Sequence, residues 1–403
     1  MEITGKKECI VKEKQQKSVT LLTEDFILIT IINLLIFFGF QMLMPTFPVY
    51  IKKLGGEDSI VGLVAGIFTV SSLVARLLSG MALDRIGRRG VFLVGLAVFI
   101  FAGLSYSWLP TIGFILMFRL IHGLGWGASS TASSTIASDS IPKERLGEGM
   151  GYFSLASSLS MAIAPAAGLF VISNYSFTIL FFVSSGLAAL GFLLSLALKY
   201  RKIEMLEQPK AKAAFFDKSA IRPSIVIFFI TMSYGTVVSF LPLYAAQGGI
   251  QNIGLFFTFY AIALLISRPV FGRISDRLGY NFAIIPGLTC VLITMVLLSQ
   301  ASIMPMFLIA AFVYGIGFGA AVSSLQAMAV VNTPPNRRGA ANATFFTGFD
   351  SGIGLGAIIF GAVASAIGYS RMYLWAVMPV VLAFILYFAI TNNKTSGVPV
   401  ENK

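Results

Sequence analysis

The sequence predicts an all-α integral membrane protein with twelve transmembrane helices in two homologous six-helix halves. Three observations support this prediction: the composition, twelve long apolar runs and an internal repeat. Of the 403 residues, 57% are apolar and only 11% are charged, and the mean hydropathy is +0.86. Because soluble domains are about 25% charged, this composition excludes a soluble enzyme, a disordered protein and a nucleic-acid-binding domain.

Each apolar run is long enough to cross a bilayer, which takes about 20 mostly apolar residues in a helix. The first six runs lie at 26–48, 60–82, 91–109, 112–138, 147–171 and 177–198. The second six lie at 223–246, 252–274, 282–300, 303–331, 339–366 and 372–391. No stretch between them is polar and long enough to form a soluble domain.

The spans divide the chain into two bundles and three polar segments. We expect a cytoplasmic tail at 1–25, a bundle at 26–198, a cytoplasmic linker at 199–222, a second bundle at 223–391 and a tail at 392–403. The lysines before residue 26 do not belong to a cleavable signal peptide, because the apolar run that follows is too long and has no small-residue cleavage site.

The basic residues predict the orientation of these spans. With the N-terminus inside, 23 of the 29 lysines and arginines fall in cytoplasmic segments and three fall in outside loops. The remaining three, Arg76, Arg119 and Arg268, lie inside predicted spans. Since cytoplasmic loops carry an excess of Lys and Arg, we expect both termini in the cytoplasm and the chain in the cell membrane.

A repeat with a constant offset of 192 residues relates the two halves. The pattern from Arg76 to Gly87 recurs from Arg268 to Gly279, and the glycine-rich stretch starting at His122 recurs at Tyr314. Two parallel repeats that rock about a site at the bilayer midplane are the design of an alternating-access transporter.

These motifs resemble the major facilitator superfamily over essentially the whole chain. The stretch from Gly80 to Arg89 matches the loop signature that this family carries between its second and third helices. The resemblance implies the major facilitator fold and a cytoplasmic lock between the halves. The implied gate residues are Gly80, Asp84, Arg85, Gly87, Arg88, Arg89, Asp276 and Arg277.

Two further motifs resemble the drug:proton antiporter branch of that family. Arg119 to Ala128 is similar to its fourth-helix signature, whose arginine is associated with proton coupling. The fifth span keeps Pro165 and Gly168 of a helix-packing antiporter motif, while small residues replace its other glycines. This departure keeps import by proton symport open as an alternative.

Asp350 is the acidic residue that lies deepest in a predicted span. Ionisable groups at such depth are costly and normally face a cavity or a partner. A carboxyl group there can bind a proton in one state and release it in another, or it can pair structurally with an arginine. We expect Asp350, Arg119 and His122 to form the proton-coupling group, since histidine changes charge near neutral pH.

Polar and aromatic residues at helical spacing predict an uncharged cavity wall around Arg119. On the fourth span, Arg119, His122, Trp126, Ser130 and Ser133 follow one another every three or four residues and so share one face. Aromatic walls suit amphipathic organic molecules; the alternative is ordinary apolar packing. The predicted cavity residues are Asn33, Phe37, Gln41, Trp126, Ser130, Tyr234, Tyr314, Phe318 and Gln326.

The resulting hypothesis is a secondary active transporter that exports small amphipathic molecules or drugs in exchange for protons. Its alternatives are export of an endogenous metabolite, such as a sugar or a metal-chelating molecule, and import by proton symport. We expect no enzyme activity, metal site, cofactor, nucleic acid or obligatory protein partner. One histidine and two cysteines do not make a metal cluster, and no ATP-binding glycine loop is present.

Overall fold

The computed structural model describes residues 21–108, 110–142, 145–200, 217–331, 333 and 338–392. The predicted tails at 1–20 and 393–403 and most of the predicted linker, 201–216, lie outside the described residues. Within the described part, the chain is helical and carries twelve helices that are long and apolar enough to cross a membrane. The predicted fold class is therefore confirmed.

The first half comprises six spans and begins with a capped helix. The Thr23 hydroxyl accepts a hydrogen bond from the Phe26 amide at 3.2 Å and so satisfies one free donor of the first turn. The chain turns at Met44 and Pro45, which divides the first span into two helices. The helices are α2 (Glu24–Leu43), α3 (Thr46–Lys53), α4 (Asp58–Arg85), α5 (Arg88–Ser105), α6 (Ile112–Ser140), α7 (Leu146–Asn174) and α8 (Phe177–Ser195).

The second half repeats this order. Its first helix begins at Lys218, five residues before the predicted seventh span, because the Asp217 carboxylate caps the Ser219 amide at 2.9 Å. The helices are α9 (Lys218–Gln247), α10 (Gly254–Leu278), α11 (Asn281–Gln300), α12 (Met304–Val331), α13 (Arg338–Ile367), α14 (Tyr369–Trp375) and α15 (Val377–Asn392), with α14 and α15 sharing one span.

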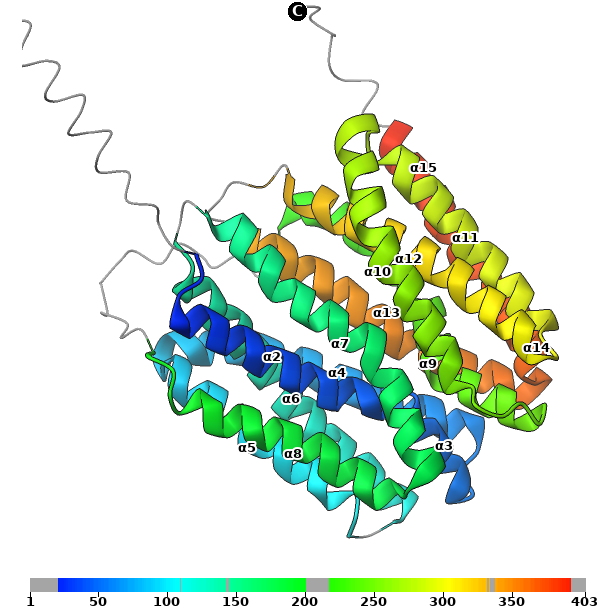
Figure 1. Cartoon of the computed structure of the whole chain (residues 1–403), viewed down its shortest axis with the longest axis horizontal. Helices are drawn as coiled ribbons and strands as arrows, with labels where there is room; N and C mark the ends of the chain where they lie inside the picture. Colours follow the sequence, from blue (N-terminus) through cyan, green and yellow to red (C-terminus); the bar gives the residue numbers. More distant parts are fainter. Residues whose placement is uncertain are drawn as a thin grey trace, which may run out of the picture.

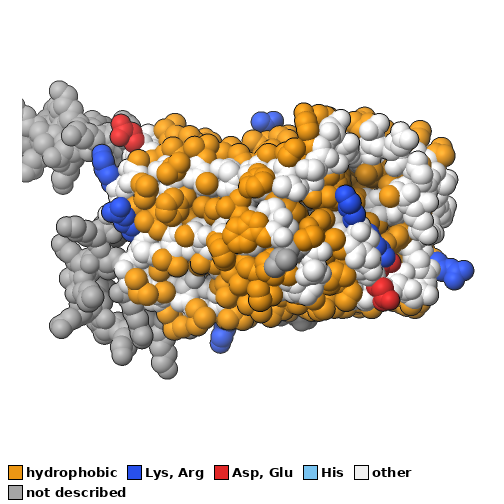
Figure 2. All heavy atoms as spheres, turned by 90° about the horizontal axis from the view of Figure 1, so that it is seen from below, with side chains coloured by type: hydrophobic (Ala, Val, Ile, Leu, Met, Phe, Trp, Pro, Cys, Tyr) orange, Lys and Arg blue, Asp and Glu red, His pale blue; other side chains and the backbone are white. Residues whose placement is uncertain are grey.

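The helices form two bundles that meet along a boundary through the middle of the molecule (Figure 1). In one bundle α4 and α5 pack on α6, and α2 packs on α7 and α8. In the other, α9 packs on α13, while α10 and α11 pack on α12. Hydrophobic side chains cover most of the flank, as a lipid-facing surface requires (Figure 2).

The bundles meet mainly through two helix pairs, α4 with α13 and α7 with α10, and α3 also packs on α9. We call the end of the molecule with Arg88, Arg89, Lys199 and Arg277 the basic end, and the opposite end the far end. Near the far end, the Tyr369 hydroxyl donates to the Asp58 carboxylate at 2.6 Å. The Ser59 amide donates to the Ser365 hydroxyl at 3.0 Å. These contacts hold the two halves together at the far end.

The tight turns at the basic end use the same backbone device in both repeats. Gly87 has φ +99° between α4 and α5, and Gly279 has φ +95° between α10 and α11. Both angles are ones that L side chains rarely adopt, so glycine is the residue suited to each turn. Two glycines that are 192 residues apart in the sequence thus have the same backbone conformation.

Candidate functional site

An ion pair inside the helical bundle connects the two halves. The Arg76 guanidinium on α4 and the Asp350 carboxylate on α13 lie 2.8 Å apart, nitrogen to oxygen. The two side chains are 20% and 27% exposed. The pair thus lies, partly exposed, where α4 packs on α13 across the boundary between the halves.

The depth of the pair follows from its place on the two helices. Arg76 is nine residues before the end of α4 at Arg85, and Asp350 is twelve residues after the start of α13 at Arg338. With a rise of about 1.5 Å per residue, both groups lie roughly 14–18 Å from the basic end. The pair therefore lies well inside the apolar part of the bundle.

The repeat places a second arginine at the mirror position, without an acid. Arg268 on α10 corresponds to Arg76, and Ser158 on α7 corresponds to Asp350, both at the offset of 192. In the structure, the Arg268 guanidinium contacts the Ser158 hydroxyl, so the mirror pair forms too. The two inter-half contacts join the same repeat positions but differ in charge.

The other two members of the predicted proton-coupling group lie elsewhere, within the first half. The Arg119 guanidinium lies 3.7 Å from the centroid of the Phe47 ring and 5.1 Å from that of Phe68. His122 Nδ1 lies 3.0 Å from the Tyr106 hydroxyl, and Tyr106 also interacts with Arg119. Arg119 and His122 are almost fully buried. This group is held by aromatic packing inside one bundle.

Arg119 and Asp350 lie at different levels of the bundle. Arg119 is seven residues from Ile112, the far-end start of α6, while Asp350 is 17 residues from Ile367, the far-end terminus of α13. At about 1.5 Å per residue, these are roughly 10 Å and 25 Å from the far end. The partner of Asp350 is Arg76, to which sequence reasoning had assigned no role.

The predicted cavity residues separate into one set in each half. In the first half, Phe37 packs edge-on to Trp126 at 4.6 Å between centroids, and the Asn33 amide donates to Ser157 at 2.9 Å. Gln41 on α2 is also buried, and the Ser130 hydroxyl on α6 is buried with no hydrogen-bond partner among the described residues.

The second set lies on α9 and α12. Tyr234 stacks on Phe318 at 5.0 Å, and Tyr314 lies 5.6 Å from the same ring. Gln326 is half-buried two turns further along α12. The two sets belong to different halves, and the aromatic side chains of Trp126, Tyr234, Tyr314 and Phe318 are all buried.

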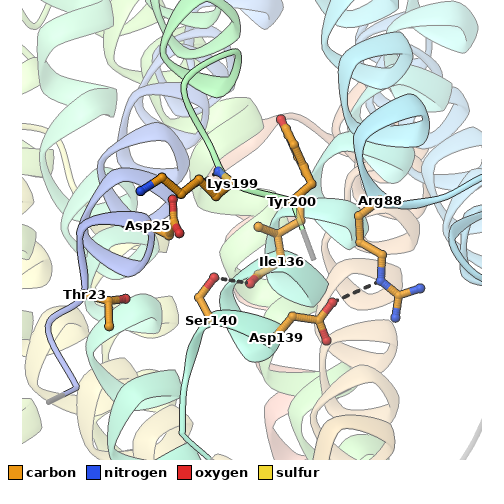
Figure 3. A pocket seen from close by; sticks show the side chains of 8 residues that line it. All are labelled: Thr23, Asp25, Arg88, Ile136, Asp139, Ser140, Lys199 and Tyr200. Atoms are coloured by element: carbon orange, nitrogen blue, oxygen red, sulfur yellow. Dashed lines mark hydrogen bonds and ion pairs between the residues drawn. The ribbon is translucent and has the colours of Figure 1, made fainter. Parts of the chain in front are cut away.

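The predicted gate residues cluster at the basic end. Arg88 Nε donates to the Asp139 carboxylate at 3.0 Å, and Arg88 Nη1 donates to the Leu83 carbonyl at 2.9 Å. This pair lines a cavity of about 200 Å³ that also contains Asp25, Lys199 and Tyr200 (Figure 3). Asp139 was not predicted, although its place at the end of the fourth span beside a basic loop is a usable signal.

The remaining gate and packing residues are placed as follows. Arg89 lies over the Tyr200 ring at 5.9 Å, Arg277 is exposed, and a side chain at Gly80 would have open space. The side chains of Asp84, Arg85 and Asp276 lie outside the described residues. Pro165 lies inside α7, where a Cβ at Gly168 would overlap the Met42 carbonyl of α2.

Arg76 and Arg268 could have been recognised from sequence by the argument that singled out Arg119. All three are charges inside apolar spans, and such charges are costly unless they face a partner or water. Arg76 and Arg268 occupy the same position of the repeat, so in the sequence they indicate symmetry first. The two arginines differ in their partners, because Asp350 pairs with Arg76 while a serine, Ser158, faces Arg268.

The comparisons with known proteins agree with this architecture. The family model described as Major Facilitator Superfamily matches residues 29–251 and 224–403. The chain belongs to the Major Facilitator Superfamily. It is thus a multi-pass membrane transporter with the superfamily fold, as the motifs had predicted.

Individual relatives in this superfamily include named exporters. The staphylopine export protein of Staphylococcus aureus is 24% identical over 90% of this chain and 95% of that protein. The multidrug resistance protein MdtG of Enterobacter lignolyticus is 26% identical over 89% of this chain and 90% of its own length. The crystal structure of the nucleoside transporter NupG has a TM-score of 0.70 at 16% identity, covers 91% of this chain and 98% of that chain, and shares the fold.

Proposed function

We propose that this superfamily member is a proton-coupled exporter of small amphipathic organic molecules, working by alternating access. The observation that carries the proposal is the Arg76–Asp350 ion pair, which joins the two halves inside the bundle. Names of relatives support export, since two of them are a multidrug resistance protein and an export protein.

The pair offers a direct link between protonation and movement. The ionised Asp350 carboxylate attracts Arg76 and favours contact between α4 and α13. Binding of a proton neutralises the carboxylate and removes that attraction, so the halves separate more readily at this level. Release of the proton on the other side restores the pair and the contact.

The orientation of the cycle follows from the distribution of basic residues. Because 23 basic residues fall on one side and three on the other, the basic end is assigned to the cytoplasm. The far end, where Tyr369 binds Asp58, is then the outside. We assign the structure to a state closed to the outside.

Proton flux in proteoliposomes tests this function. Purified protein is reconstituted with a pH dye in the lumen and challenged with cationic, neutral and anionic compounds. We expect at least one compound to drive proton movement in the wild type, and Asp350→Asn to abolish it because asparagine does not titrate. Glu57→Gln, which removes an acid at the far-end loop, serves as the matched control and keeps the flux.

Three outcomes would contradict the proposal in different ways. Transport without proton movement indicates a facilitator, and unchanged flux in Asp350→Asn removes the coupling role of Asp350. Proton and substrate movement in the same direction identifies a symporter, which is the alternative that the departures in the fifth-span motif keep open.

A further inference from the structure

The buried charges of the two halves do not balance. Among the described helices, four Asp, Glu, Lys or Arg side chains lie more than six residues from either helix end: Arg76, Arg119, Arg268 and Asp350. Asp350 neutralises Arg76. Since charges at this depth require partners or water, two arginines remain to be explained.

Arg119 has a packing explanation that Arg268 lacks. The Arg119 guanidinium stacks 3.7 Å from the Phe47 ring, a contact that stabilises a desolvated cation. Arg268 contacts a serine hydroxyl, and its Nε is buried with no hydrogen-bond acceptor among the described residues. Arg268 is also only half-buried, on a helix that packs across the boundary between the halves.

Aromatic groups surround the same place. Tyr260, two turns before Arg268 on α10, interacts with it, and the Tyr260 hydroxyl is buried without a partner in the described part of the chain. Tyr260 lies 5.5 Å from Tyr314 and 6.2 Å from Phe318, which belong to the predicted cavity wall. A cation, a free hydroxyl donor and aromatic rings therefore adjoin one another.

We infer that Arg268 binds the carboxylate of the transported molecule, and that this molecule is an aromatic or amphipathic organic anion. The inference rests on the proposed transport function and names its substrate class. On α4 and α13 the protein supplies the anion, Asp350; on α10 and α7 the mirror position holds Ser158, and the substrate supplies it. A guanidinium can hold a carboxylate through two parallel hydrogen bonds.

Neutral polar groups of the first half lie one residue along α7 from the Arg268 contact. Ser157, next to Ser158 on α7, accepts from the Asn33 amide at 2.9 Å, and Ser133 donates to the Asn33 carbonyl oxygen at 3.4 Å. These groups are hydrogen-bonded to one another, so the charged contact with the substrate is assigned to Arg268.

Equilibrium binding to the full-length protein in detergent tests the inference without any proton gradient. The probes are N-acetylphenylalanine and its uncharged amide, with benzoate and benzamide as a second pair, read by the shift in thermal unfolding midpoint over a concentration series. In the wild type we expect each carboxylate to bind about tenfold more tightly than its amide, as expected for a hydrogen-bonded charge.

Two substitutions of Ser158 separate charge from shape. Ser158→Asp supplies the missing acid and copies the Arg76–Asp350 pair, so we expect the carboxylate preference to disappear. Ser158→Asn has nearly the same shape without the charge and keeps the preference. If Ser158→Asp does not fold, Arg268→Gln replaces it and loses the preference for the same reason.

The inference is overturned if the carboxylates bind no more tightly than their amides in the wild type, or if Ser158→Asn loses the preference as completely as Ser158→Asp. Binding that follows the expected pattern while no compound moves protons would contradict the proposed coupling and leave the anion site standing. Proton flux driven by cations or neutral compounds alone would support the coupling and reject the anion site.

Discussion

The interface of α4 with α13 and the interface of α7 with α10 occupy equivalent places in the two repeats, but their backbones are packed at different distances. At the interface of α4 with α13, glycines bring the backbones together: a Cβ at Gly62 would overlap the Ala357 carbonyl, and one at Gly66 would overlap Ile358. At the interface of α7 with α10, the repeat mate of Gly62 is Gly254, whose Cβ would lie an ordinary 3.6 Å from Leu169.

The two interfaces also differ in the charged groups that they contain. The close interface carries a complete ion pair, and the looser one carries an arginine against a serine. The two interfaces thus use the same repeat positions but differ in the spacing of their backbones and in the charges that they carry.

The largest expected difference between the interfaces concerns their arginines. Arg76→Gln leaves the Asp350 carboxylate without its partner, so we expect the free energy of unfolding to fall by about 2 kcal/mol, less than the 3–5 kcal/mol of a fully buried pair because both groups are partly exposed. Arg268→Gln removes a cation that pairs with no described acid, so stability should stay the same or rise. Thermal unfolding of the purified variants measures both.

The double variant Arg76→Gln/Asp350→Asn sharpens that result. If Arg76→Gln lowers the free energy of unfolding because it leaves Asp350 unpaired, the double variant recovers most of the lost stability. The interaction energy from this double-mutant cycle is then about 1 kcal/mol or more. Equal losses for Arg76→Gln and Arg268→Gln would show that the pair adds nothing to the interface of α4 with α13.

The second prediction compares the two related glycines. Gly62→Ala forces α4 away from the Ala357 carbonyl, at a cost of about 1–3 kcal/mol, as for other over-packed sites. Gly254→Ala has space and should change stability by less than about 0.5 kcal/mol. The same unfolding assay compares them, and similar values for both would mean that the interfaces are equally tight.

The third prediction concerns the far-end contact of α14 with α4. Tyr369→Phe removes a 2.6 Å hydrogen bond to the Asp58 carboxylate, which Lys52 still contacts at 2.8 Å. We expect this end to open more often, at a cost of about 1.5 kcal/mol for a hydrogen bond to a charged group.

Labelling of a cysteine at position 59 with a membrane-impermeant maleimide measures this opening, in a background where Cys9 and Cys290 are serines. Tyr373→Phe is the matched control, because the Tyr373 hydroxyl is buried without a hydrogen-bond partner among the described residues. Maleimide labelling that is as fast in Tyr373→Phe as in Tyr369→Phe, or faster, would show that the hydrogen bond between Tyr369 and Asp58 does not keep the far end closed.

The smallest effect is expected where the repeats still agree. Gly87→Ala and Gly279→Ala place a Cβ on backbones at φ +99° and +95°, which costs about 1 kcal/mol at each turn. The two losses of unfolding free energy should match within about 0.5 kcal/mol. A clear difference between the two losses would show that the repeats differ at these turns as well as at the interfaces between the halves.

Residues at the two interfaces show how far sequence reasoning reaches. The depth of Asp350 in its span predicted that it faces a partner or a cavity, because a charge in the bilayer is costly, and the structure gives it a partner. Its partner was not predictable, since Arg76 is 274 residues away and meets it only through the packing of two halves. Arg119 and Asp350 shared a predicted role, yet helix direction and packing set them at different levels.

The sequence by itself determined the twelve spans, the repeat of 192 residues and the superfamily, because hydrophobic length, glycine turns and charge placement are local properties. Only the tertiary structure decided which charges meet across the boundary and which arginine is left facing a serine. That outcome depends on how closely two bundles approach, and the approach is set by side chains that are distant in the chain and adjacent in space.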